Sequence, residues 1–254
     1  MLAVLLLALL QPQVSADAPV VFDASHATVS APKTVAELDT GTLKGDFVAL
    51  AWSDDGTAFY LRTAEYDRWR NETPHHYVIK AAGGTIATVG DPPPWAGAYW
   101  MWKSGMAAPG VPEMRLETDT QTRMMTAVGS VSDGGASQSR ADPSRPQVMA
   151  DASSAQQVTT ATIKLKGTII TQSTNKAVQP GQVWGWAPAS MGALAFVTDK
   201  KRLVLIDRNG RTSDVESAAD VMLPAWSPDG KRIAFVQRKD KKKYVLNIVE
   251  VGSR

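Results

Sequence analysis

Clusters of basic side chains are the part of this sequence best suited to binding chemistry. Lysine and arginine crowd a short stretch near the C-terminus, and a smaller group stands earlier in the chain. Exposed cations of this kind attract an acidic protein partner or an anionic lipid surface. They also occur as solvated hairpin tips, which is the simpler interpretation. The candidate partner-binding residues are Lys200, Lys201, Arg202, Arg238, Lys239, Lys241, Lys242 and Lys243.

Catalytic signals are absent by comparison. The chain has no cysteine, which removes thiol nucleophiles, thiolate metal sites and disulfides together. A serine hydrolase of the α/β type would need G-x-S-x-G, and Ser190 lies in a segment that lacks the first glycine. We therefore predict a protein that is not an enzyme and has no catalytic residue.

Metal and cofactor sites are not predicted either. His75 and His76 are adjacent, so on a strand they would point to opposite faces and could not share one metal. Asp54, Asp55 and Asp229 stand in turns, where aspartate is favoured because its side chain bonds to nearby backbone. No series of alternating oxygen ligands accompanies them, which argues against calcium.

The overall composition is that of a globular protein with a sizeable core. Apolar residues make up 44% of the 254, and the net charge is only +2, so nucleic acid is not an expected partner. Tryptophan outnumbers phenylalanine, eight to five, which indicates an aromatic position that recurs along the chain.

The N-terminus has the pattern of an export signal. Residues Leu2–Leu10 are continuously apolar, and Val14–Ala16 offers a small-residue cleavage site before Asp17. No cationic residue precedes the apolar run, and a buried strand or helix is the alternative. We predict a signal peptide over residues 1–16 and export without disulfides to a bacterial periplasm, with secretion as the broader reading.

The elements that would carry these residues repeat along the chain. Leu223–Val251 reads as strand, turn, strand, turn, strand, with Pro228, Asp229 and Gly230 supplying the first turn. Residues 47–61 match it position by position, and a third copy begins near Trp186. A degenerate copy begins near Trp102.

The spacing of the tryptophan markers predicts the architecture. Trp186 and Trp226 are 40 residues apart, Trp52 and Trp102 are 50 apart, and the 84 residues between Trp102 and Trp186 leave room for one extra copy. A period near 40 to 45 with about four strands is typical of propeller blades. We predict an all-β β-propeller of four-stranded antiparallel blades, about four to six in number, with incomplete or degenerate copies among them.

The best-preserved unit, Trp226–Phe235, closely resembles the TolB-like propeller repeat, also called the WD40-like or PD40 repeat. Trp52–Gly56 resembles it with one substitution. The resemblance implies that the tryptophan packs between blades and that Asp-Gly forms the turn, and it says little about function. The structural repeat residues are Trp52, Asp55, Gly56, Trp186, Trp226, Pro228, Asp229 and Gly230.

The predicted domain plan follows. Residues 17–45 are an N-terminal segment in which Val20–Phe22 could complete the last blade, and residues 46–254 hold the repeats. A polar stretch at about 130–157 is predicted to be a low-complexity loop, since it has too few large apolar residues to offset the entropy of ordering.

Three functions remain open at this point. The first is a non-catalytic, exported scaffold that binds a protein partner on one propeller face. The second is an accessory or sensor propeller that binds a small ligand or peptide in its central channel; the third is a propeller-based hydrolase or lyase. The aromatic cluster Trp95, Tyr99, Trp100 and Trp102 is either packing between blades or part of a ligand groove.

Overall fold

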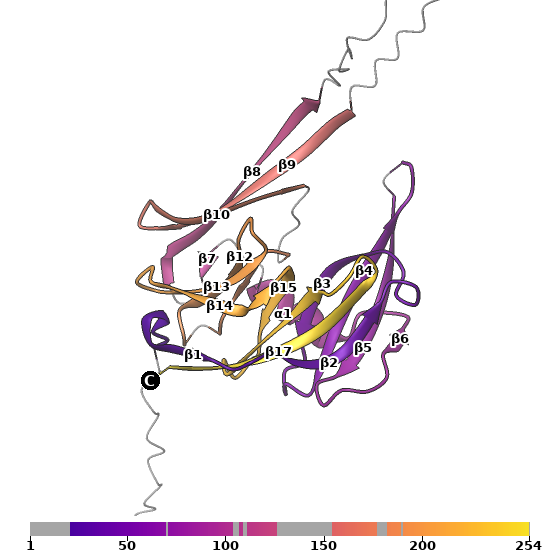
Figure 1. The fold of residues 1–254 in the computed structure, drawn as a ribbon, viewed down its shortest axis with the longest axis horizontal. Coiled ribbons are helices and arrows are strands. Elements are labelled where there is room, and N and C mark those ends of the chain that lie inside the picture. Colours follow the sequence, from indigo (N-terminus) through magenta and orange to yellow (C-terminus); the bar gives the residue numbers. More distant parts are fainter. Residues whose placement is uncertain are drawn as a thin grey trace, which may run out of the picture.

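The structure is a computed structural model that describes residues 21–69, 71–103, 107–108, 111–125, 154–176, 182–188 and 190–253. These residues form four antiparallel sheets, a short 3-10 helix and one α-helix (Figure 1). In three of these sheets neighbouring strands follow one another in the chain, and in the fourth the first two strands of the chain pair with the last. The prediction of an all-β fold built from four-stranded, blade-like antiparallel sheets is confirmed.

Sheet I consists of β3 (Asp46–Trp52), β4 (Ala58–Tyr66), β5 (Glu72–Lys80) and β6 (Ala87–Val89). Sheet II consists of β7 (Ala107–Ala108), β8 (Val111–Met125), β9 (Ser154–Leu165) and β10 (Thr168–Lys176). Sheet III consists of β11 (Trp184–Trp186), β12 (Ala193–Val197), β13 (Arg202–Asp207) and β14 (Thr212–Ala219). Sheet IV consists of β15 (Val221–Trp226), β16 (Arg232–Arg238), β17 (Lys243–Ser253), β1 (Ala27–Val29) and β2 (Lys33–Asp39). The helices are η1 (Ala24–His26) and α1 (Pro94–Lys103).

The first turn of two sheets is held by a serine and an aspartate. In sheet I, Ser53 Oγ donates to Asp55 Oδ1 at 2.6 Å and accepts from the Ala58 N–H at 2.9 Å. In sheet IV, Ser227 donates to Asp229 in the same way. Gly56 lies at φ 66°, a left-handed conformation that glycine adopts without strain. The repeated motif therefore specifies the β3–β4 and β15–β16 hairpins locally.

The four sheets lie in the order I, IV, III, II. The inner strand of sheet IV, β15, packs against both β3 and β11. One hydrophobic cluster joins sheet IV to sheets II and III, and a second joins it to sheet I and α1. Successive residues of β16 alternate between them, since Ile233 and Phe235 enter the first cluster and Ala234 and Val236 the second. Sheet IV is thus buried on both faces.

The repeated tryptophans lie inside these clusters. Trp52, Trp186 and Trp226 are fully buried. The Trp52 indole N–H donates to the Ala225 carbonyl across the boundary between sheets I and IV, at 2.9 Å. The guanidinium of Arg232 stacks over the Trp52 ring, 4.7 Å from its centroid. Each contact fixes one sheet against the next.

The N-terminal segment completes sheet IV, although not through the predicted residues. Antiparallel pairing with β17 comes from β1 and β2. Val21 and Phe22 are outside any strand, and Phe22 instead packs edge-on against Trp226 with ring centroids 5.7 Å apart. Val20 lies outside the described residues. The misplacement has a physical reason: the Phe22 ring is buried against Trp226, and this packing holds the segment outside any strand, while Val21 stays 42% exposed.

Two further expectations need correction. The segment around Trp102, predicted to begin a blade, belongs to α1, and its Tyr99 is buried and donates to the Trp226 carbonyl at 2.6 Å. The long gap before Trp186 holds one sheet, II, within the described residues, rather than two repeats. Of the predicted loop at 130–157, residues 126–153 lie outside the described residues, while Ser154–Gln157 belong to β9.

Replacement of Trp226 by alanine tests the packing between sheets. Trp226→Ala removes a fully buried indole, so we expect the free energy of unfolding to fall by about 3–5 kcal/mol. Trp69→Ala is the control, because Trp69 is 72% exposed and should cost within about 0.5 kcal/mol. Urea unfolding followed by far-UV circular dichroism measures both. Similar losses for the two variants would contradict the packing described.

The Asp55 turn predicts a pH dependence. Hydrogen bonds from Ser53 and Thr57 lower the pKa of Asp55 from 3.8 to about 2. Because the pKa is depressed in the folded state, this carboxylate adds stability above pH 3.8 that is lost as the pH falls through about 2. We expect Asp55→Asn to flatten the dependence of unfolding free energy on pH in that window. Asp54→Asn is the matched control, because it removes the neighbouring charge and leaves the hydrogen bonds of Asp55 with Ser53 and Thr57 in place.

Candidate functional site

The inner strands of sheets I, III and IV begin around one small pocket. Phe47 contributes from the start of β3, Val183 from just before β11, and Val221 from the start of β15. The pocket has a volume of about 160 Å³ and a mainly apolar wall. Its lining residues are Phe47, Gln182, Val183, Val197, Lys201, Val221, Met222 and Leu223. We call it the axial pocket, because it lies between the inner strands of three blade-like sheets.

Unusual backbone conformations gather at this pocket. Lys201, Asp220 and Leu223 have φ angles of 54°, 53° and 55°, and two of these residues line the pocket. A left-handed conformation costs a residue with a Cβ atom about 1–2 kcal/mol. Backbone hydrogen bonds hold it in place: the Leu223 N–H donates to the Gln182 carbonyl at 2.8 Å, and the Val221 N–H donates to Lys201 at 3.1 Å. Such strain tends to occur at ligand-binding sites.

Asp220 connects the two predicted basic hairpin tips. Its Oδ2 accepts from Arg238 Nε at 2.7 Å, and its Oδ1 lies 3.4 Å from Lys201 Nζ. The Asp220 carbonyl also accepts from the Arg238 N–H at 3.0 Å. The hydrogen bond to Asp220 raises the pKa of Arg238. The structure therefore brings together, at the mouth of the axial pocket, two clusters that are separate in the sequence.

The surface around this mouth is strongly positive. All eight candidate cations are described, and only Lys201 among them is half-buried rather than exposed. Asp199 and Asp240 lie in the same turns as these cations and Asp220 lies between β14 and β15, so these eleven residues together carry a formal charge of +5. Asp39 of β2 lies opposite Lys243 as a further acid. We call the eleven residues the basic face. Its members are Lys200, Lys201 and Arg202 at the β12–β13 turn, Arg238, Lys239, Lys241, Lys242 and Lys243 at the β16–β17 turn, and the acids Asp199, Asp220 and Asp240.

The repeat residues lie at the other end of the inner strands. Asp55 and Gly56 follow the end of β3, and Pro228–Gly230 follow the end of β15. Arg232 connects these two turns, since one of its guanidinium nitrogens donates to the Gly56 carbonyl at 3.4 Å. Tyr99 of α1 lies at this end as well, and burial raises its pKa well above the usual value. These contacts are structural.

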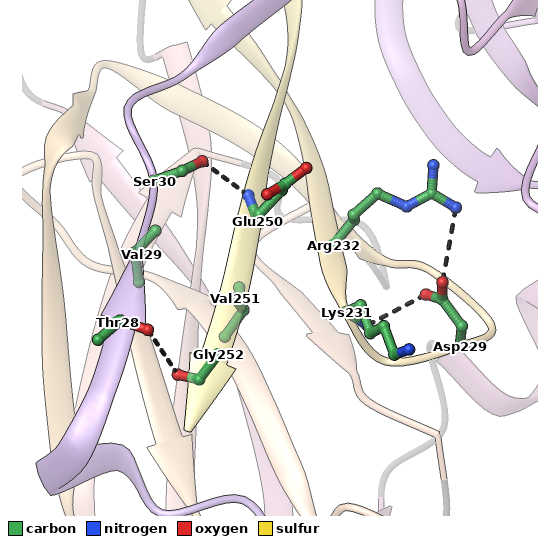
Figure 2. Close-up of a pocket in the computed structure, with 9 residues that line it drawn as sticks. All are labelled: Thr28, Val29, Ser30, Asp229, Lys231, Arg232, Glu250, Val251 and Gly252. Carbon is green, nitrogen blue, oxygen red and sulfur yellow. Dashed lines mark hydrogen bonds and ion pairs between the residues drawn. The ribbon is translucent and has the colours of Figure 1, made fainter. Parts of the chain in front are cut away.

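A second, wider hollow lies beside β17. It measures about 760 Å³ and lies between β1, the end of β17 and the β15–β16 turn (Figure 2). Its polar groups mainly hold the edge strand and the turn: Ser30 Oγ accepts from the Glu250 N–H, Thr28 donates to Gly252, and Asp229 accepts from the Lys231 N–H (Figure 2). Two acidic residues, Asp229 and Glu250, and two basic residues, Lys231 and Arg232, line the hollow, so their formal charges cancel. This hollow has no charge preference to select a ligand.

Each histidine of β5 pairs with one neighbouring side chain. On β5, His75 pairs with Glu65 at 2.9 Å and His76 with the Tyr60 hydroxyl at 2.7 Å. Burial, helped by Arg62, lowers the pKa of His76. Within the described residues, no group of three or more metal-ligating side chains comes together, and no helix is long and apolar enough to cross a membrane.

Two members of the predicted aromatic cluster, Trp95 and Tyr99, have packing roles. Trp95 packs edge-on against Tyr60, with ring centroids 6.4 Å apart, and Tyr99 is buried. The side chains of Trp100 and Trp102 lie outside the described residues. Sequence reasoning missed the pocket wall, because residues such as Phe47 and Val183 are ordinary strand residues and only the assembly of three sheets brings them together.

The four blade-like sheets place the chain in the broad class of all-β, propeller-type proteins. No family model and no curated protein matches the sequence. Distant matches to solved β-propeller proteins exist. A glucose dehydrogenase is 14% identical with a TM-score of 0.29, over 83% of this chain and 82% of that one.

Two further solved structures are similar at the same level. One is Sqt1 from Chaetomium thermophilum, at 12% identity and a TM-score of 0.21, over 83% of this chain and 44% of that chain. The other is an oligogalacturonate lyase in complex with manganese, at 12% identity and a TM-score of 0.24, over 82% and 48%. The chain thus spans less than half the length of these two. Likeness this distant carries no argument about function.

The strain at Lys201 predicts an unusual response to glycine. Lys201→Gly relieves a left-handed conformation and loses an exposed ion pair worth at most about 1 kcal/mol, so we expect little net change in unfolding free energy. Lys200→Gly is the matched control, because Lys200 has no positive φ to relieve and should lose about 0.5–1 kcal/mol. Equal losses for the two variants, measured by urea unfolding, would mean that position 201 is not strained.

Proposed function

We propose that this chain is a non-catalytic, TolB-like binding module exported to the bacterial periplasm, where it holds a protein partner on its basic face. The repeat residues from Trp226 to Phe235 and from Trp52 to Gly56 support the family assignment. The apolar segment Leu2–Leu10 and the small residues that follow it support export.

The charge distribution favours an acidic segment of the partner. The whole chain carries +2, whereas the basic face alone carries +5, so the remainder of the chain is net negative. A concentrated field of one sign steers an oppositely charged partner and fixes its orientation. A partner with acidic side chains would bind at this face and be repelled elsewhere.

The axial pocket gives this face a place for an anchor side chain. A volume of about 160 Å³ is below the 300–1,000 Å³ typical of small-molecule sites, so it suits one apolar side chain of a partner. Buried anchors of this kind supply much of the affinity of protein interfaces. The single observation that carries the proposal is the strained backbone at Lys201 and Leu223, which the chain maintains at the pocket wall.

A sensor that binds a short peptide is the second candidate. The same pocket and cations would hold it, and the small volume argues against a free small molecule in this place. The two candidates differ in whether the acidic segment belongs to a folded partner. Both require the basic face, so one experiment tests what they share.

Charge-neutralising variants test the basic face. The probe is a fluorescein-labelled acidic peptide with one central leucine, and binding is followed by fluorescence anisotropy. We expect Lys239, Lys241 and Lys242→Gln together to weaken binding about tenfold, since each exposed ion pair contributes up to about 1 kcal/mol. Lys33, Lys80 and Lys231→Gln remove the same charge from exposed positions elsewhere and should leave binding nearly unchanged.

The leucine of the same peptide tests the pocket. Its replacement by alanine should weaken binding by about tenfold, because burial of a leucine side chain stabilises by about 1.5–3 kcal/mol. Equal affinity for the two peptides would remove the pocket from the proposal. If both triple Lys→Gln variants weakened binding equally, the effect would come from the total charge of the chain and not from the basic face.

A further inference from the structure

Strand β8 has a long edge without a strand partner. Along one edge it pairs with β9 from Met114 to Met125. Along the other edge β7 covers only the part from Val111 to Arg115. Within the described residues, no strand pairs with this second edge from position 116 to position 125. Among the residues that the structure describes, the backbone donors and acceptors on this side of the stretch thus have no strand partner.

This edge is also accessible. The hairpin of β8 and β9 runs outward from the body of the molecule (Figure 1). The five residues from Glu117 to Gln121 are all exposed. A long open strand edge is a template for pairing with another chain unless the protein protects it. The geometry leaves the arm free to meet a partner without interference from the other three sheets.

We propose that this chain forms a dimer with a second copy by antiparallel pairing of β8 with β8 across a twofold axis at Thr120. The charge pattern of the strand supports this register, in which Glu117 keeps the ion pair with Lys164 of β9 that it forms in its own chain and gains a second cation. With Thr120 opposite its own copy, Glu117 lies opposite Arg123 of the second copy, and the twofold axis repeats this pair. Opposite charges at directly opposed positions stabilise an antiparallel pair.

The other positions of this register are compatible as well. Thr118 lies opposite Thr122, Thr120 opposite itself, and Asp119 opposite Gln121. Threonine pairs are among the favourable cross-strand pairs. No two like charges are directly opposed over this stretch, from position 116 to position 124. The strand is thus complementary to a copy of itself.

A dimer held by one strand pair would be weak. Nine paired residues on each chain bury less surface than the interfaces of stable complexes, so we expect a dissociation constant in the micromolar range. Such a dimer would place two basic faces in one particle, and bivalent binding would then raise the apparent affinity for a partner that carries two acidic segments.

Charge reversal in the full chain tests the pairing. Sedimentation velocity of the wild-type chain from about 1 to 200 µM should show a monomer–dimer equilibrium. E117R alone and R123E alone each create two like-charge pairs in a symmetric dimer, so each should raise the dissociation constant at least about tenfold. Mixed in equal amounts, the two variants should dimerise with each other, because every opposed pair is then complementary.

E113R is the matched control. Glu113 is an exposed glutamate on the same strand, at a position where β7 covers the edge, and its reversal should leave the dimer intact. Circular dichroism of each variant establishes that loss of dimer is not loss of fold. A wild-type chain that stays monomeric, or a mixture of E117R and R123E that stays monomeric, overturns the proposal.

Discussion

The fold depends on the burial of sheet IV on both of its faces. A single antiparallel sheet of this kind has two apolar faces, which is why β16 is buried at five successive positions from Ile233 to Gln237. Sheets I and III cover these faces, and Trp52 and Trp226 lie at the two boundaries. The order of the sheets in space follows from this requirement, since the last sheet in the chain must lie between two others.

The candidate site is a consequence of the same arrangement. Phe47, Val183 and Val221 lie at or beside the starts of three inner strands, and the axial pocket lies between them. Asp220 adopts positive φ just before β15, Leu223 adopts it within β15, and Lys201 adopts it in the β12–β13 turn. Asp220 then joins the cationic tips of two sheets, so the charge and the pocket share one mouth. Packing, positive φ angles and charge thus coincide around Lys201 and Asp220.

The sequence predicted the fold where the signal was local, and failed where it depended on contacts between sheets. Ser53 and Asp55 bond within their own turn, so a motif of five residues was sufficient to place a hairpin. A degenerate copy of the repeat was predicted to begin near Trp102, and this segment instead belongs to α1. Its helical signals were present: Pro94 at the first helical position, and Trp95, Tyr99 and Trp102 at helical spacing. The spacing of the tryptophans along the chain nevertheless matched the repeat, and this match led to the wrong prediction.

The candidate site was predictable in its charge and not in its shape. The two lysine-rich stretches are visible in the sequence itself, and their residues were predicted as candidate partner-binding residues. The pocket wall comes from residues such as Val183 and Met222, which carry no mark until three sheets are assembled. The strain at Leu223 is equally invisible, because a leucine at positive φ contradicts its own propensity. Tertiary hydrogen bonds impose that conformation, and this is the reason for placing function there rather than at the better-marked turns.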